Sequence, residues 1–274
     1  MSDFIAHSVV SGIPDAPAIL LLNSMGTTTA MWRPHLALLE RHFRVISMDT
    51  RGHGDSGTPE GPYSFADLVA DATSVLDRHG VKTARVMGCS IGGMTAIGLG
   101  LAAPSRVARI ICVAARADAP APFKKTWDDR KTLIEAKGLD ALWDDLVNLW
   151  LTPEFQAAAP DVVAEMKAAF QQTDPAGYNH LGAALKQLNY LKDLPNLRMP
   201  CLFVAGSADT AAPPHVMQDM AARIPNSRFV VIPNARHIVN VNAPAAFSNA
   251  ISAFLGIDAP GMLDARGRAD RGTA

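Results

Sequence analysis

The chain has 274 residues, of which 49% are hydrophobic and 19% charged, a composition that suits one sizeable globular domain with an insertion, or two domains at most. Its formal net charge is −1 and its isoelectric point is about 6.7, so it lacks the electrostatic footprint of a nucleic-acid or anionic-membrane binder. No apolar run reaches the ~18 residues that span a bilayer, and the first residues, MSDFIAHSVV, lead us to expect no signal peptide.

Short apolar runs bounded by turn residues predict the strands, and apolar positions at helical spacing predict the helices. In the first part of the chain we expect strands at residues 4–10, 18–22, 43–48, 84–89 and 107–114, and helices at 30–41, from Ser64 onward and at 91–103. The alternation resumes late, with strands at 201–205 and 228–232 and helices at 213–223 and 243–255. It predicts an α/β fold with a mostly parallel, doubly wound sheet.

The pattern is different between residues 116 and 195, where prolines break a series of helical periods and no strand is evident. Three of the four tryptophans, Trp127, Trp143 and Trp150, fall in this segment. We interpret it as a helical cap inserted into a core made of residues 1–115 and 196–257. The tail at 258–274 is polar, rich in Gly and Arg and aperiodic, and is predicted to be disordered.

The three cysteines, Cys89, Cys112 and Cys201, are odd in number and far apart in the chain. They provide neither a disulfide framework nor the C-x-x-C spacing of a metal site, and we therefore expect a protein of the reducing cytoplasm. No histidine cluster has the spacing of metal ligands either, so the sequence indicates no metal and no other cofactor.

The most informative motif is G-x-S-x-G at residues 88–92, with Ser90 at its centre, between a predicted strand and a predicted helix. In that context the motif indicates a nucleophile elbow, a strained turn that exposes the serine hydroxyl at the edge of the sheet. The outer residues, Gly88 and Gly92, leave room because they have no Cβ. The alternative is a glycine-rich turn with an incidental serine.

A serine hydroxyl needs a general base, and the base needs an orienting acid, before the serine can attack a carbonyl. Asp209 follows the strand predicted at 201–205 and His237 follows the one at 228–232, so both should emerge at the carboxyl edge of the sheet. The order Ser90, Asp209, His237 is that of α/β-hydrolase triads.

Each member of this predicted triad has a rival. His53, in a Gly-rich loop, and His215, in a predicted helix, are alternative bases, and Asp118, in the cap segment, is an alternative acid. Taken singly, Asp209 could be a helix-capping turn residue and His237 an ordinary loop histidine; their order and strand-end positions favour the triad.

An acyl-transfer site also needs hydrogen-bond donors for the oxyanion that forms on the attacked carbonyl. We expect one donor to be the backbone N–H of Ile91, directly after the nucleophile. The other should come from the loop after the first buried strand, where we select the backbone N–H of Met25.

These motifs resemble those of the α/β-hydrolase superfamily and, within it, of the 3-oxoadipate enol-lactonases, over residues 18–255. The N-S-x-G-T loop at residues 23–27 is similar to that family's oxyanion loop, and the sequences GCSIGGM and HIVNV are similar to its elbow and histidine motifs. Trp127 and Arg130 match its W-x-x-R pattern, and LWLT at 149–152 resembles its R-W-F-T. The chain departs from the family at Asn242, where Glu is usual, and at residues 189–190, where the family has Asp.

The resemblance implies an α/β-hydrolase fold and a cytoplasmic, cofactor-independent serine hydrolase that cleaves a small carboxylic ester or lactone through an acyl-enzyme, in aromatic-compound catabolism. Its partner would be that small molecule, with no nucleic acid and no membrane; monomer and homo-oligomer stay equally open. Two alternatives also remain. The same triad could perform C–C bond hydrolysis, amide hydrolysis or perhydrolysis, or the fold could bind a ligand without catalysis.

The resemblance further implies that Trp127, Arg130 and Trp150 bind the substrate. Because the net charge gives no long-range steering, a substrate carboxylate would need a local cation. Arg130 lies three residues after Trp127, on the same helix face, and could hold a carboxylate through two parallel hydrogen bonds. The many charged residues around Arg130 support the alternative equally well, namely that Arg130 belongs to a solvated, charged helix face.

Overall fold

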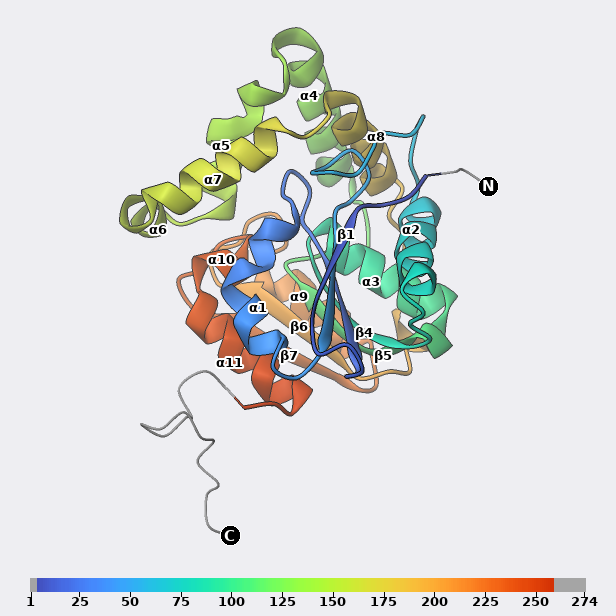
Figure 1. Cartoon of the computed structure of the whole chain (residues 1–274). Helices are drawn as coiled ribbons and strands as arrows, with labels where there is room; N and C mark the ends of the chain where they lie inside the picture. Colours follow the sequence, from blue (N-terminus) through green and yellow to red (C-terminus); the bar gives the residue numbers. More distant parts are fainter. Residues whose placement is uncertain (1–3, 259–274) are drawn as a thin grey trace.

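One sheet runs through the part of the chain that the computed structural model describes, residues 4–258. Within these residues it has seven strands: β1 (Ser8–Gly12), β2 (Ala18–Leu22), β3 (Arg44–Met48), β4 (Ala84–Cys89), β5 (Val107–Val113), β6 (Cys201–Gly206) and β7 (Ser227–Ile232). Their order is β1-β3-β2-β4-β5-β6-β7 (Figure 1). The edge strand β1 is antiparallel to β3, and every other pair is parallel. The predicted α/β fold is thereby confirmed.

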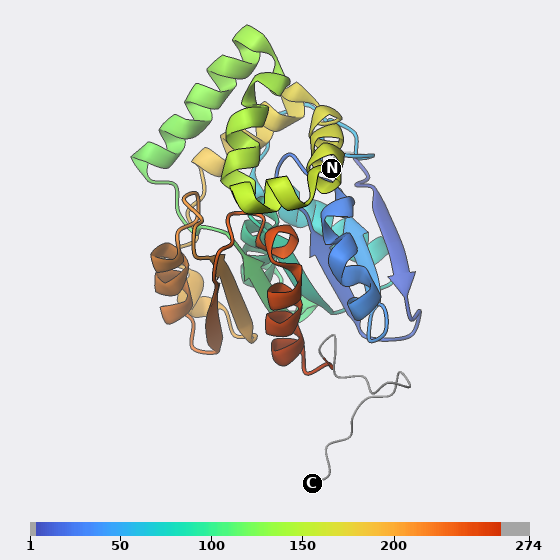
Figure 2. The same ribbon diagram turned by 90° about the vertical axis from the view of Figure 1, so that its left-hand side faces the viewer.

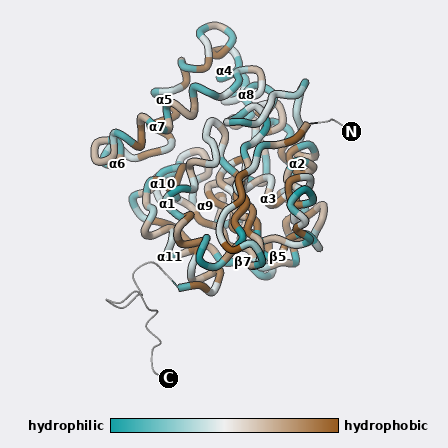
Figure 3. Tube along the Cα trace, viewed as in Figure 1, coloured by the Kyte–Doolittle hydropathy of each residue, from teal (hydrophilic) through white to brown (hydrophobic). Residues whose placement is uncertain are grey.

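Helices cover both faces of the sheet. The core helices are α1 (Arg33–Leu39), α2 (Phe65–Arg78), α3 (Ile91–Ala102), α9 (Pro214–Ala222), α10 (Val239–Asn242) and α11 (Pro244–Leu255), with short 3₁₀ turns at Thr29–Trp32, Pro104–Arg106 and Leu194–Asn196. Helix α1 packs beside α11 on one face and α2 beside α3 on the other (Figure 1). Because helices cover both faces, the inner strands β2 and β6 are buried over their whole length. Their sequences are therefore unbroken apolar runs. In Figure 3 much of the trace at the centre of the molecule has the brown of hydrophobic residues.

Between β5 and β6 the chain forms a layer of helices that lies over the carboxyl ends of the strands (Figures 1 and 2). These helices are α4 (Ala121–Lys137), a 3₁₀ turn at Leu139–Leu142, α5 (Trp143–Trp150), α6 (Pro153–Ala158), α7 (Pro160–Gln171) and α8 (Pro175–Lys186). In residues 116–195, all of them described, the only strand-like pairing is an isolated bridge between Asp118 and Asn189. We call this layer the cap; residues of the cap and of the strand ends below it together line a pocket.

Most element boundaries lie within one or two residues of the sequence-based predictions, and three features differ more. The edge strand begins at Ser8, because its ladder is set by antiparallel pairing with β3, and not at residue 4 as predicted. The helix expected at 30–41 starts as a 3₁₀ turn before α1. Helix α10, with four residues, was not predicted because it is too short to show a period. The tail predicted from residue 258 onward lies outside the described residues except for Asp258.

The start of α2 confirms a local prediction. The Ser64 backbone N–H donates to the Asp67 carboxylate at 2.8 Å, and the Asp67 backbone N–H donates back to the Ser64 hydroxyl oxygen at 3.3 Å. This reciprocal capping box satisfies two donors that the helix itself cannot.

Among the described helices, none combines the length and the apolar character that a bilayer-spanning segment needs.

A buried histidine connects three helices beneath the cap. His35 of α1 donates from Nε2 to the carbonyl oxygen of Asn240 in α10 and accepts at Nδ1 from the hydroxyl of Ser248 in α11, both at 2.9 Å. Burial lowers the pKa of His35 to about 4, although its bond to Asn240 acts in the opposite direction. The imidazole is therefore neutral at neutral pH, in the tautomer that the two bonds require.

This arrangement makes stability depend on acidification. The pKa of His35 is about 4 in the folded chain, against 6.5 for an unperturbed histidine, so the unfolded state takes up this proton first as the pH falls. The contribution of His35 is complete above pH 6.5 and declines by about 1.4 kcal/mol per pH unit down to pH 4. His35→Gln should therefore flatten the pH dependence of the unfolding free energy over this range, measured by urea titration; an unchanged slope would contradict the prediction.

Candidate active site

Ser90 stands on the turn between β4 and α3, with φ 54° and ψ −117°. An L-residue rarely adopts a positive φ, and such strain persists only where the surroundings enforce it. Here the chain approaches itself too closely for side chains: a Cβ on Gly88 would lie 2.2 Å from the Gly92 carbonyl group, and one on Gly92 would lie 2.3 Å from the Leu22 carbonyl oxygen. The two glycines thus allow the turn that raises Ser90 at the strand end.

His237 and Asp209 meet at the same edge of the sheet. His237 Nδ1 and Asp209 Oδ2 are 2.8 Å apart, and both side chains are buried. The other carboxylate oxygen, Oδ1, accepts the backbone N–H groups of Ala211 at 2.8 Å and Ala212 at 3.1 Å. Burial alone would raise the pKa of Asp209, but the charge of His237 and these hydrogen bonds outweigh it and lower the pKa. The carboxylate therefore stays ionised and holds the imidazole through its Nδ1.

The cap is attached to the loop that carries His237. The backbone N–H of His237 donates to the carbonyl oxygen of Leu149 at 3.3 Å, and that of Ile238 donates to Trp150 at 3.1 Å. Asn242 supports the same junction, since its Oδ1 accepts the backbone N–H groups of Arg236 at 2.8 Å and Thr152 at 3.3 Å. The end of α5 and the histidine loop are thus one hydrogen-bonded unit, and Asn242 is one of its supports.

The rival residues have other partners. His53 is buried, accepts the Gly26 N–H at Nε2 (2.8 Å) and donates from Nδ1 to the Arg51 carbonyl oxygen (3.2 Å). Both ring nitrogens are therefore committed to backbone groups. Burial lowers the pKa of His53 to about 4, so the ring is neutral at neutral pH. His215 lies on α9, and Asp118 pairs with Arg116 at 3.4 Å. None of the three rivals lines the pocket that contains Ser90.

The loop after β2 is held in place by polar contacts with the next strand end. Asn23 donates from Nδ2 to the carbonyl oxygens of Ser24 and Thr27, and accepts at Oδ1 from the Thr50 N–H (3.1 Å) and hydroxyl (2.8 Å). Met25 is buried in this loop and lines the pocket. Ile91 is the first residue of α3, so its N–H has no acceptor within the helix. The two predicted oxyanion donors therefore belong to a fixed loop and a helix start.

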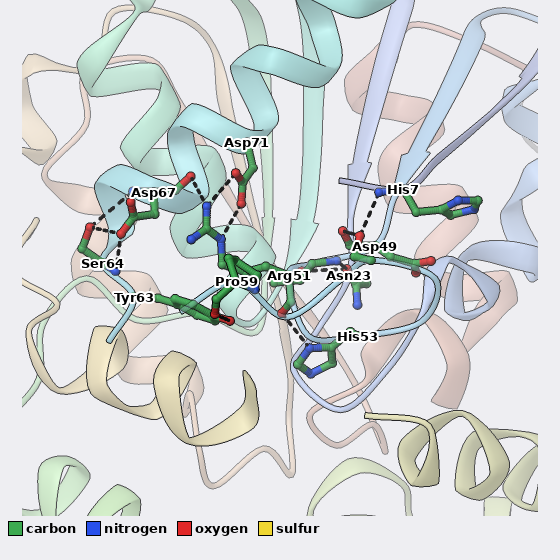
Figure 4. Close-up of polar contacts among 12 residues, drawn as sticks. His7, Asn23, Asp49, Arg51, His53, Pro59, Tyr63, Ser64, Asp67 and Asp71 are labelled. Carbon is green, nitrogen blue, oxygen red and sulfur yellow. Dashed lines mark hydrogen bonds and ion pairs between the residues drawn. The ribbon is translucent and has the colours of Figure 1, made fainter. Parts of the chain in front are cut away.

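The loop that carries His53 is fixed in turn by a buried ion pair (Figure 4). Arg51 Nε and Nη2 each donate to one carboxylate oxygen of Asp71 at 2.7 Å. The guanidinium also lies 4.8 Å from the centre of the Tyr63 ring, whose hydroxyl donates to the Pro59 carbonyl oxygen at 2.7 Å. A two-pronged pair of this kind is geometrically specific, and it anchors the loop on α2.

Ser90 and His237 open into a pocket of about 380 Å³ between sheet and cap. Its lining includes Met25 and the predicted substrate-binding residues Trp127, Arg130 and Trp150. Two arginines, Arg116 and Arg130, line it, and no aspartate or glutamate does so among the described residues. The sequence analysis did not identify Arg116 as a pocket residue. It did not identify Tyr178 either, whose hydroxyl oxygen accepts from Arg130 Nη1 at 3.4 Å.

One group of side chains has the spacing of metal ligands. His7, Asp49 and Asp55 offer ligand atoms that all lie within 4.8 Å of one another. This group contains a single histidine, and its buried member, Asp49, already accepts the backbone N–H groups of Thr29 and Asp55. It lies at the start of β1 and the loop after β3, and none of its residues lines the Ser90 pocket.

Comparison with known proteins agrees with this fold. A family model described as the alpha/beta hydrolase fold matches residues 17–244. The chain belongs to the α/β-hydrolase family. It is 32% identical to 3-oxoadipate enol-lactonase 2 of Acinetobacter baylyi, over 89% of this chain and 90% of that protein. These findings confirm the resemblance to enol-lactonases that the motifs indicated.

Other members of the α/β-hydrolase family are similar over nearly the whole chain. The crystal structure of an enol-lactonase from Burkholderia xenovorans superposes with a TM-score of 0.88 at 32% identity, covering 92% of this chain and 96% of that one. A relative from Azorhizobium caulinodans, named as a carbamate hydrolase, is 29% identical over 87% of this chain and 91% of its own length. The chain is thus a hydrolase of the α/β family, close to enol-lactonases.

The contact between His53 and Gly26 generates a prediction. His53→Ala should release the loop that carries Met25 and lower kcat by up to about 100-fold, the effect that a misplacement of about 1 Å can have. His53→Gln should retain much of the activity because its amide oxygen can still accept the Gly26 N–H. Steady-state kinetics on both variants test this; equal losses in the two would show that the hydrogen bond is not what matters.

Proposed function

We propose that the protein is a serine hydrolase of small carboxylic esters or lactones, and that it acts through an acyl-enzyme. One observation carries the proposal: Ser90, on its strained turn, and His237, which is paired with the buried Asp209, line the same pocket. Serine, an imidazole oriented by a buried carboxylate, and backbone donors nearby are the parts that acyl transfer needs.

The proposed mechanism assigns a role to each group. Ser90 Oγ attacks the substrate carbonyl while His237 takes its proton at Nε2, and the N–H groups of Met25 and Ile91 bind the oxyanion. His237 then returns the proton to the leaving oxygen, which leaves the acyl group on Ser90. A water molecule, deprotonated by His237, cleaves the acyl-enzyme. Asp209 stabilises the imidazolium at each transfer.

The pocket's charge supports an anionic substrate. Arg130 lies with its guanidinium carbon 4.7 Å from the centre of the Trp127 ring and has a neutral partner in Tyr178. No acidic side chain among the described residues lines the pocket to neutralise it. The substrate we propose is therefore an ester or lactone that carries a carboxylate, held by Arg130 and walled by Trp127 and Trp150.

Carbamate or amide hydrolysis on the same three residues is the second candidate, favoured by the relative named as a carbamate hydrolase. A panel of p-nitrophenyl esters, simple lactones, a carboxylated enol-lactone and matching carbamates separates the two. The proposal expects the carboxylated lactone or ester to have the highest kcat/KM; a preference for carbamates would overturn it in favour of the second candidate.

The nucleophile assignment has a direct test. Ser90→Ala should keep the fold and lower kcat by about 10⁶-fold, with His237→Ala nearly as damaging and the double variant little worse, because the residues act as a unit. A fluorophosphonate probe should label the parent protein and not Ser90→Ala. His215→Ala is the matched histidine control, because His215 lies on α9 outside the pocket. A larger loss of kcat in His215→Ala than in His237→Ala would mean that His237 is not the base.

The carboxylate assignment is tested at Arg130. Arg130→Leu should lower kcat/KM for a carboxylated lactone by about 10- to 100-fold, the range for a lost charge-assisted hydrogen bond, and should lower it much less for the uncharged methyl ester. Lys131→Leu is the matched control, because Lys131 is exposed, pairs with Glu135 and does not line the Ser90 pocket. Equal losses on acid and ester would mean that Arg130 does not recognise the carboxylate.

A further inference from the structure

Arg116 is the second cation of the Ser90 pocket, and the proposed mechanism does not use it. It follows β5, lines the pocket, and has a side chain that is only 14% exposed. Its guanidinium carbon lies 5.4 Å from the centre of the Phe123 ring, on the first turn of α4. The Arg116 side chain is thus half-buried on the wall of a pocket that no aspartate or glutamate among the described residues lines, and this placement calls for an explanation.

The contacts of Arg116 do not satisfy its donors. A guanidinium has five N–H groups, yet its one ion pair joins Nη2 to Asp118 Oδ1 at 3.4 Å, longer than a good charge-assisted hydrogen bond. Its Nε is buried and has no hydrogen-bond partner among the described residues. Buried donors without acceptors destabilise a fold and are rare. An anion in the adjoining pocket would offer a closer acceptor to the terminal Nη groups, whose present ion pair is long.

The two arginines stand at different points along the pocket wall. Phe123 and Trp127 are one helical turn apart on α4, with ring centres 5.9 Å apart and an edge-to-face arrangement. Arg116 lies against the first ring and Arg130 against the second. Each cation is thus stacked on its own aromatic residue, which provides two anion positions separated along α4 instead of one shared clamp.

We propose that the pocket binds substrates with two anionic groups: one carboxylate at Arg130 and a second at Arg116. This rests on the proposed function and narrows its substrate class to a small ester or lactone with two carboxylates, whose hydrolysis generates a third. With a net charge of −1 over the whole chain, attraction of such a polyanion depends on these local cations. Phe123 and Trp127 contact the apolar chain between the two carboxylates.

The test measures binding without turnover. Ser90→Ala is titrated by calorimetry, at one ionic strength, with straight-chain dicarboxylates of four to ten carbons and with the monomethyl ester of each, which has the same length and one anion fewer. We expect one chain length to bind about tenfold tighter as the diacid than as its monomethyl ester, the gain of one added charge-assisted contact. Adding Arg116→Gln should bring the ratio of the two dissociation constants close to one.

Two further variants separate recognition from structural support. Asp118→Asn removes the present partner of Arg116 and should strengthen diacid binding; a purely structural pair would instead make it behave like Arg116→Gln. Arg116→Lys, which keeps the charge, should retain part of the diacid preference if Arg116→Gln proves too unstable to purify. The proposal is overturned if no diacid binds tighter than its monomethyl ester, or if Arg116→Gln weakens both alike. Intact diacid preference without any ester hydrolysis would instead overturn the proposed function alone.

Discussion

The close approach of three backbone segments around Ser90 is the constraint on which the site depends. Gly88, Gly92 and the end of β2 at Leu22 lie so near one another that a single Cβ would force them apart. That contact holds Ser90 at a positive φ and places the start of α3 beside the loop after β2. The nucleophile that we propose and the proposed donors for its oxyanion are therefore positioned by the same packing, and a disturbance of one displaces the other.

A chain of polar contacts extends this constraint outward. His53 holds the loop of Met25 through Gly26, and the buried pair between Arg51 and Asp71 fixes the segment that carries His53. The low pKa of His53 follows from its burial and keeps it as a neutral acceptor. His53, an alternative base by its sequence, is here part of the scaffold, because both of its ring nitrogens are bonded to backbone groups.

The sheet, and the strand ends at which the candidate site residues lie, could be predicted from the sequence for a physical reason. Inner parallel strands such as β2 and β6 are buried on both faces and give unbroken apolar runs, and the topology then brings the residues after β4, β6 and β7 to one edge. Arg116 could not be found in this way: its contact with Phe123 depends on how the cap folds back over the sheet, which no periodicity records. The same holds for the start of β1, which is set by pairing with β3.

The backbone bonds from His237 and Ile238 to the end of α5 have a consequence for access to the pocket. They make α5 the stationary side of the cap, because lifting it would pull on the loop that aims the imidazole. Helix α8 is tied to the core as well, because the backbone N–H of Asp174 at its start donates to the Gly52 carbonyl oxygen at 3.0 Å. An opening movement that leaves the histidine in register is therefore left to α4. Arg130 and Trp127 belong to α4, so the groups that we propose to recognise an anion lie on the part of the cap that this tether leaves free to move.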